Sequence, residues 1–111
     1  MEISIEQQSD VAIVVAGGRL DAAGAPEIET RCKDLIQKGS KRLLLDMAAV
    51  EYISSAGLRS LLVLAKAVKA VGGTLILCSL TPAVREVMTI SGFDNILSLA
   101  ADRSVAMGLL K

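Results

Sequence analysis

The sequence contains no histidine, and this absence excludes more chemistry than any motif in it. Without an imidazole, the chain alone cannot build a Ser-His-Asp or Cys-His catalytic site. Its two cysteines, Cys32 and Cys78, are far apart and lack the C-x-x-C spacing of a metal site. Because free cysteines are usually interior, we expect two buried thiols, no metal site and no cofactor.

Aromatic residues are scarce, and charge of one sign is never concentrated. One Tyr, one Phe and no Trp accompany a hydrophobic fraction of 52%, so the predicted core is aliphatic. Lys and Arg total 12, and Asp and Glu also total 12, which gives a formal net charge of zero. This balance argues against nucleic acid as a partner.

Long apolar runs are also missing. The runs at 11–16 and 61–65 are far shorter than the roughly 18 residues that a membrane span requires. The first ten residues, MEISIEQQSD, lack the basic and then apolar pattern of a leader. We therefore expect a soluble, cytoplasmic protein with no direct membrane insertion, and 111 residues fit one domain, 1–111.

Short β-branched or apolar runs mark the predicted strands. The first two are separated by a polar turn and predict an antiparallel hairpin. Two later runs are apolar throughout and bounded by polar residues, which is typical of buried central strands. A weaker run near the C-terminus predicts a last strand. The predicted strands cover residues 3–5, 11–16, 42–47, 73–78 and 96–99.

Four other segments have apolar residues at helical spacing. Pro26 suits the first turn of one helix, which Gly39 ends, and the pair Thr81-Pro82 begins another that ends at Gly92. The predicted helices cover residues 26–38, 54–71, 81–91 and 102–110.

The order of these elements predicts an α/β fold. We expect a mixed, mostly parallel sheet of four to five strands with an antiparallel N-terminal hairpin, packed by about four helices. In such sheets, functional surface collects where strands end and helices begin. The stretch YISSAGLRSLL, at 52–62, lies at one of these places.

Ser54 and Ser55 have two interpretations at this boundary. A serine before a helix accepts a hydrogen bond from a free backbone N–H group, and its replacement by alanine costs about 1 kcal/mol. Either serine could act as this cap. The same N–H groups and the partial positive charge of a helix start also stabilise an anion, so a phosphate on Ser55 would be tolerated there. It would change any protein surface that contacts the helix start.

Three other residues, Gly57, Asp21 and Arg59, each have an interpretation that requires no function. Gly57 either leaves the backbone open to an approaching protein or allows close helix packing. Asp21 lies in a glycine-rich turn, where an aspartate side chain often bonds to neighbouring backbone groups. Arg59 is either a solvated side chain on the wetter helix face or a partner contact.

Several short motifs occur together along the chain. They are GRLD at 18–21, LDM at 45–47, SSAGL at 54–58, GG at 72–73, SLTPAV at 79–84 and SGF at 91–93. In combination they resemble the STAS domain family, specifically the small bacterial anti-sigma factor antagonists, over nearly the whole chain. The resemblance implies a STAS-like domain over 1–111.

The resemblance also implies a function. In that family, the unmodified protein binds an anti-sigma factor that is also a serine kinase, and a sigma factor is released. The kinase then phosphorylates its antagonist, and a serine phosphatase of the metal-dependent class removes the phosphate. The family's phosphoacceptor position corresponds to Ser55, with Ser54 as second choice. The implied partner-binding residues are Asp21, Ser54, Ser55, Ala56, Gly57, Leu58 and Arg59.

The motif departs from the family's best-known form at two positions. Ser54 replaces an aspartate that precedes the phosphoacceptor, and Ala56 replaces a second serine. The lost carboxylate bears on kinase recognition, and Ser54 offers a neighbouring acceptor.

Two alternative functions remain for comparison. One is a STAS subunit of a signalling scaffold or of a lipid-transport complex, which requires no phosphorylation. The other is an enzyme with Ser55 as nucleophile, but the turn lacks G-x-S-x-G and the chain lacks a histidine base. We therefore expect a binding protein and not an enzyme.

Overall fold

The sheet has five strands in the order β1-β2-β3-β4-β5 in the computed structural model, which describes residues 1–110. β1 (Glu2–Gln8) and β2 (Val11–Leu20) form an antiparallel hairpin. β3 (Arg42–Ile53), β4 (Thr74–Cys78) and β5 (Leu99–Ala100) continue the sheet, each parallel to its neighbour from β2 onwards. The predicted mixed sheet with an N-terminal hairpin is confirmed.

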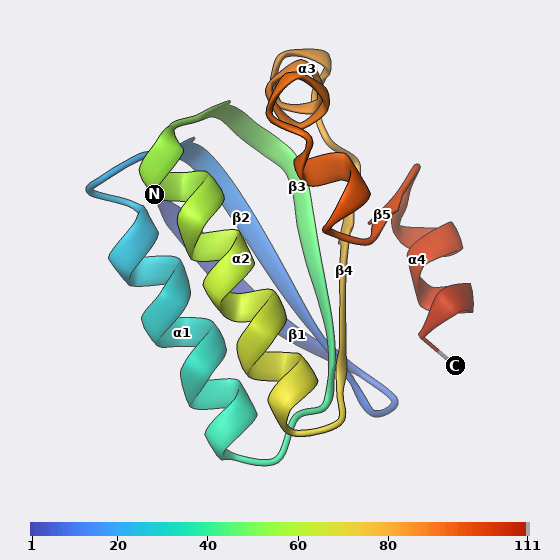
Figure 1. Cartoon of the computed structure of the whole chain (residues 1–111). Coiled ribbons are helices and arrows are strands. Elements are labelled where there is room, and N and C mark those ends of the chain that lie inside the picture. Colours follow the sequence, from blue (N-terminus) through green and yellow to red (C-terminus); the bar gives the residue numbers. More distant parts are fainter. Residues whose placement is uncertain (111) are drawn as a thin grey trace.

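Within residues 1–110, four α-helices cover the sheet unequally, as Figure 1 shows. α1 (Ala25–Gln37) and α2 (Ser55–Ala70) lie side by side on one face. α3 (Pro82–Ser91) packs at the end of β3, and α4 (Arg103–Leu109) covers part of the opposite face. The number of predicted helices and their positions in the chain are confirmed.

β3 contributes to both faces of the core, which explains its uninterrupted apolar start. Leu43 and Leu45 belong to the layer beneath α1 and α2, whereas Leu44 belongs to the layer beneath α4. Cys32 and Cys78 are both buried, as predicted, one in each layer. Burial raises the pKa of the Cys32 thiol to about 12, so it remains protonated at neutral pH.

The predicted end of β3 at Met47 is wrong, because the strand continues to Ile53. Two alanines and a glutamate interrupt the apolar pattern after Met47. The strand continues nevertheless because β2 pairs with it to its own end, where Leu20 lies opposite Ile53. The register shifts twice along this pair, and these irregularities disrupt the alternation that predicts a strand.

The predicted last strand at 96–99 is also displaced. A 3₁₀ turn occupies Phe93–Asn95, Ile96 is 59% exposed, and β5 begins only at Leu99. The turn follows the left-handed backbone of Gly92, and the Leu97 N–H donates to the Phe93 carbonyl. Ile96 therefore belongs to a turn, and its apolar side chain gave a misleading signal.

One ion pair joins α4 to the sheet. Asp46, which is 9% exposed in the middle of β3, accepts hydrogen bonds at Oδ2 from Arg103 Nε and Nη2, at 3.2 and 2.7 Å. Its Oδ1 accepts from the Ala48 N–H at 3.0 Å. Arg103 Nη1 also lies 3.5 Å from Glu6 Oε1 on β1. The ion pair explains why a carboxylate occupies the position between the buried residues Leu45 and Met47.

Replacing Arg103 by methionine should lower the free energy of unfolding by about 2 kcal/mol, because it leaves the largely buried Asp46 carboxylate without its charged partner. Urea denaturation at neutral pH measures this change. Glu6→Gln is the matched control, since its exposed contact should contribute less than about 1 kcal/mol. Equal losses in the two variants would contradict the role assigned to Asp46.

Candidate functional site

The predicted site residues meet where β2 and β3 end. The Ser54 N–H donates to the Leu20 carbonyl at 3.0 Å, across the last register pair of the two strands. Beyond this bond, β3 leads into α2, whereas β2 ends and the backbone turns at Asp21 toward α1. The pairing of two parallel strands thus brings Asp21 and the two serines, which are distant in sequence, to the same corner of the sheet.

The two serines differ in what their hydroxyls do. Ser54 is the N-cap of α2, and its Oγ accepts from the Gly57 N–H at 3.3 Å. Ser54 Oγ also donates to the Leu20 carbonyl at 3.5 Å. Ser55 is the first residue of α2 and is exposed. The structural role is therefore filled by Ser54, and the Ser55 hydroxyl is accessible.

Gly57 allows α2 to pack closely on the end of β2. A Cβ atom at this position would lie 2.3 Å from the Leu20 carbonyl oxygen and 2.9 Å from Ile53 Cγ1. Of the two interpretations of this glycine, close helix packing is the one that the structure shows. The next residue, Leu58, is 8% exposed and faces the core.

The surface of the first helical turn is therefore formed by a subset of the predicted residues. Ser55 and Arg59 are exposed, and Ser54 and Ala56 are half-buried, whereas Gly57 and Leu58 are buried. The buried pair positions the helix, and the others are accessible from outside. Contact of any of them with a partner stays a prediction.

Asp21 stabilises the turn that leads into α1. Its Oδ1 accepts from the Ala23 and Gly24 N–H groups, both at 3.1 Å, and its Oδ2 lies 3.5 Å from Arg19 Nε. The hydrogen bond from the Gly24 N–H is the largest influence on the pKa of this carboxyl, and desolvation, which raises the pKa, is the second. Together with the Ala23 N–H and Arg19, the Gly24 N–H outweighs desolvation and lowers the pKa. The side chain is 32% exposed, so an ionised carboxylate is presented beside the start of α2.

Arg19 and Tyr52 also belong to this corner, and the sequence did not indicate either one. They are register partners on β2 and β3, and the Arg19 guanidinium carbon lies 4.2 Å from the Tyr52 ring centroid. Tyr52, the chain's single tyrosine, is 41% exposed. An exposed aromatic residue stacked on an arginine is typical of residues that dominate binding energy in protein interfaces. An arginine two residues before Asp21 was the signal that could have suggested the pair.

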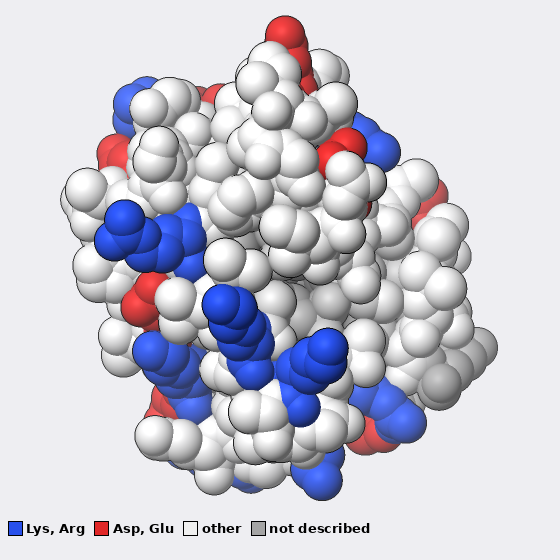
Figure 2. Space-filling model, viewed as in Figure 1, with Lys and Arg blue, Asp and Glu red and all other residues white. Residues whose placement is uncertain are grey.

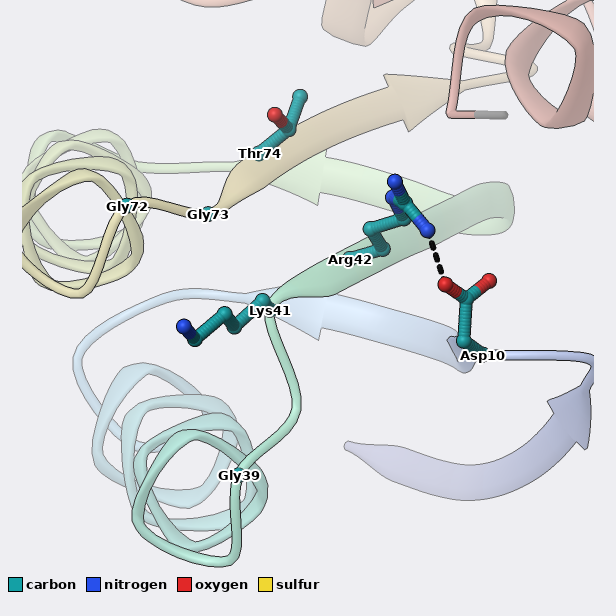
Figure 3. A pocket seen from close by; sticks show the side chains of 7 residues that line it. All are labelled: Asp10, Gly39, Lys41, Arg42, Gly72, Gly73 and Thr74. Carbon is teal, nitrogen blue, oxygen red and sulfur yellow. Dashed lines mark hydrogen bonds and ion pairs between the residues drawn. The ribbon is translucent and has the colours of Figure 1, made fainter.

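A separate cavity of about 380 Å³ lies at the opposite end of the sheet, where β3 and β4 begin (Figure 3). Arg42 is paired with Asp10 there, and Lys41 points away from both in Figure 3. The Gly73 and Thr74 N–H groups donate to the carbonyls of Val68 and Lys41. Because these polar groups bond within the fold, the cavity is a weaker candidate than the corner at Ser55.

The groups that the Ser55 corner exposes are able to form hydrogen bonds and ion pairs with another molecule. Its accessible groups are a hydroxyl, a carboxylate, guanidinium groups and a phenol, and no histidine exists to activate Ser55. Across residues 1–110, no cluster of three or more His, Cys, Asp or Glu side chains could hold a metal ion. Nor does any helix in this range have the length and apolarity needed to cross a membrane.

Comparison with known proteins gives consistent results. The model of a family described as "STAS domain" matches residues 2–106. A protein named as anti-sigma factor antagonist BtrV, from Bordetella bronchiseptica, is 38% identical over 111 residues, which are 100% of this chain and 96% of that protein.

Solved structures share the fold. One described as an anti-sigma factor antagonist from Thermotoga maritima has a TM-score of 0.91 at 24% identity, covering 97% of this chain and 93% of the other. The phosphorylated form of the Bacillus protein SpoIIAA has a TM-score of 0.74 at 20% identity, covering 99% of this chain and all of the other (100%). At these identities the two structures establish similarity of fold alone.

The different roles of the two serines can be measured. Ser54→Ala should lower the free energy of unfolding by about 1 kcal/mol, because it removes the N-cap of α2. Ser55→Ala should change it by less than about 0.5 kcal/mol, since this hydroxyl is exposed. Chemical denaturation of both variants compares them directly. A larger loss for Ser55→Ala would mean that Ser55 supplies the cap.

A second substitution tests the close packing of α2. Gly57→Ala should destabilise the protein by roughly 1–3 kcal/mol, because the added Cβ would overlap the Leu20 carbonyl and force the backbone to move. Gly108→Ala is the matched control in α4, where no atom lies within 4 Å of an added Cβ. There alanine should leave stability unchanged or raise it by up to about 1 kcal/mol. Thermal unfolding measures the stability of both variants. A higher melting temperature for Gly57→Ala would contradict the close packing of α2 on β2.

Proposed function

Because the chain belongs to the STAS domain family, we propose that it acts as an anti-sigma factor antagonist whose unmodified form binds an anti-sigma factor that is also a serine kinase. Binding removes the anti-sigma factor from its sigma factor. The name of the 38% identical relative, which aligns with the whole chain, supports this function. The protein then acts by contact with its partner and not as an enzyme.

Phosphorylation of Ser55 by that kinase ends the interaction in this proposal. The observation that carries the proposal is the exposure of Ser55 at the first position of α2, while Ser54 caps the helix. Ser54 is half-buried and its oxygen is already bonded, so it is the poorer acceptor. A serine phosphatase of the metal-dependent class would restore the unmodified form at the same exposed position.

The fold can accept a phosphate at this position. The N–H groups of Ser55 and Ala56 lie in the first turn, where no intrahelical acceptor exists. A helix N-terminus also carries about half a positive charge, which stabilises a dianion. Arg59 lies one turn further along the same face of α2. The phosphate is therefore stabilised by the helix, and no conformational change is required.

The same phosphate opposes binding of a partner. It adds roughly −1.5 to −2 charges, which an interface would partly desolvate. The ionised Asp21 beside the start of α2 adds a second negative charge at this corner. Together these effects should cost several kcal/mol of binding free energy, which corresponds to a partner affinity roughly 100-fold to 1,000-fold weaker.

Incubation with the cognate kinase and ATP, followed by mass spectrometry, tests the proposal. We expect one phosphate on Ser55, none on Ser55→Ala, and continued modification of Ser54→Ala. The phosphorylated protein should bind the kinase about 100-fold or more weakly than the unmodified protein. Absence of phosphate on both Ser54 and Ser55 would refute this regulation.

Two aspartate variants separate the charge at Ser55 from charge in general. Ser55→Asp should weaken kinase binding at least about tenfold, whereas Ser55→Ala should retain it. Ser104→Asp places the same charge on an exposed serine in the first turn of α4 and should have little effect. A pull-down with the wild-type protein gives a separate test. If it retrieved only components of membrane transport, the proposed function would be wrong.

A further inference from the structure

α2 carries three basic residues and no acidic residue. They are Arg59, Lys66 and Lys69, and none of them forms an ion pair within residues 1–110. On α1, by contrast, Lys33 pairs with Glu29 at 4.0 Å, and Lys38, directly after the helix, pairs with Asp34 at 2.9 Å. With three basic residues and no acidic residue, α2 carries a formal charge of +3 in a chain whose formal net charge is zero.

These cations follow the outermost face of α2. Arg59, Leu62, Lys66 and Lys69, hereafter the basic stripe, recur every three or four residues after Ser55 and therefore share its face. The fully buried side chains of the helix, among them Leu61 and Leu64, point in other directions, toward the core. Figure 2 shows Lys and Arg side chains along α2 on this face of the molecule. From Ser55 to Lys69 the face is about 21 Å long.

We propose that the basic stripe is a docking surface for an acidic segment of the partner, the anti-sigma factor kinase. This inference rests on the proposed function and extends it from the start of α2 along the helix. The stripe is continuous with Ser55, so one partner can contact both. The half-buried Leu62 offers apolar contact between the cations, and exposed cations raise the rate of association with an acidic surface.

An acidic protein fits the stripe better than a membrane or a nucleic acid does. Surface segments that bind anionic lipids have clusters of roughly four to eight cations, whereas the stripe has three. Its single apolar side chain is half-buried in the fold and cannot insert into lipid. Nucleic-acid affinity depends on the number of phosphates neutralised, and three contacts give little of it. Complementary charge steers the association of two proteins, so exposed cations on α2 favour an acidic protein segment as the partner.

The stripe also connects to the phosphate on Ser55. Arg59 lies four residues after Ser55 on the same face, which is the spacing at which opposite charges interact along a helix. A phosphate on Ser55 would attract the Arg59 guanidinium and withdraw it from a partner. The phosphate would then repel the acidic segment, and it would also neutralise the positive charge of Arg59, which attracts that segment.

Charge reversal at the far end of the stripe tests the inference without altering the first turn. Lys66→Glu/Lys69→Glu should weaken binding to the kinase about tenfold or more at about 50 mM salt, and the difference should shrink at about 500 mM because exposed charges are screened. Lys33→Glu/Lys41→Glu makes the same change in net charge at two positions outside the stripe and should alter affinity less than about threefold. Circular dichroism checks that all variants remain folded.

The possible outcomes separate this inference from the proposed function. If wild-type protein binds the kinase and Lys66→Glu/Lys69→Glu binds equally well, the docking surface is wrong and the proposed function stands. If wild-type protein binds no kinase, both are wrong. Sedimentation of wild-type protein with phosphatidylserine vesicles, lost in the double variant, would assign the stripe to a membrane and overturn the inference.

Discussion

The contact between the Leu20 carbonyl and the first turn of α2 determines the geometry of the site. This oxygen, at the end of β2, accepts from the Ser54 N–H, and a side chain at Gly57 would collide with it. Helix, strand end and cap are thereby fixed relative to one another. With α2 held in this way, Ser54 is directed toward the fold and Ser55 away from it.

The structure assigns stability and accessibility to different residues of the same corner. Ser54 and Gly57 maintain the helix start, while Ser55 and Arg59 are exposed. The ion pair of Asp46 with Arg103 lies on the opposite face of the sheet and holds α4 independently of the site. A charged group added to Ser55 would therefore alter the surface of the molecule without disturbing its packing.

The sequence predicts the fold well where local patterns decide the structure. Apolar spacing and the caps at Thr81 and Gly92 located the helices, and the two buried strands were recognisable from their apolar runs. β3 was predicted too short and β5 too early, because pairing with β2 and the turn after Gly92 override local composition.

The details of the site were less predictable, for a common physical reason. Which serine caps α2, why position 57 is glycine, and how Arg19 meets Tyr52 all depend on the register between β2 and β3. That register places residues together that lie more than 30 positions apart, and no local pattern encodes it. The sequence indicates the candidate serines and Asp21, but it does not indicate that Ser54 caps α2, that Ser55 is exposed and that Asp21 stabilises the turn before α1.

The most direct test compares the amide chemical shifts of the Ser55-phosphorylated protein with those of the unmodified protein. It shows whether a phosphate on Ser55 changes the surface of the molecule and leaves its packing intact. We expect shift changes confined to the first turn of α2, Arg59 and the turn at Asp21. The melting temperature should differ by no more than about 5 °C. Changes spread across β3 and β4, or loss of the folded spectrum, would contradict the claim that this helix start accepts a dianion.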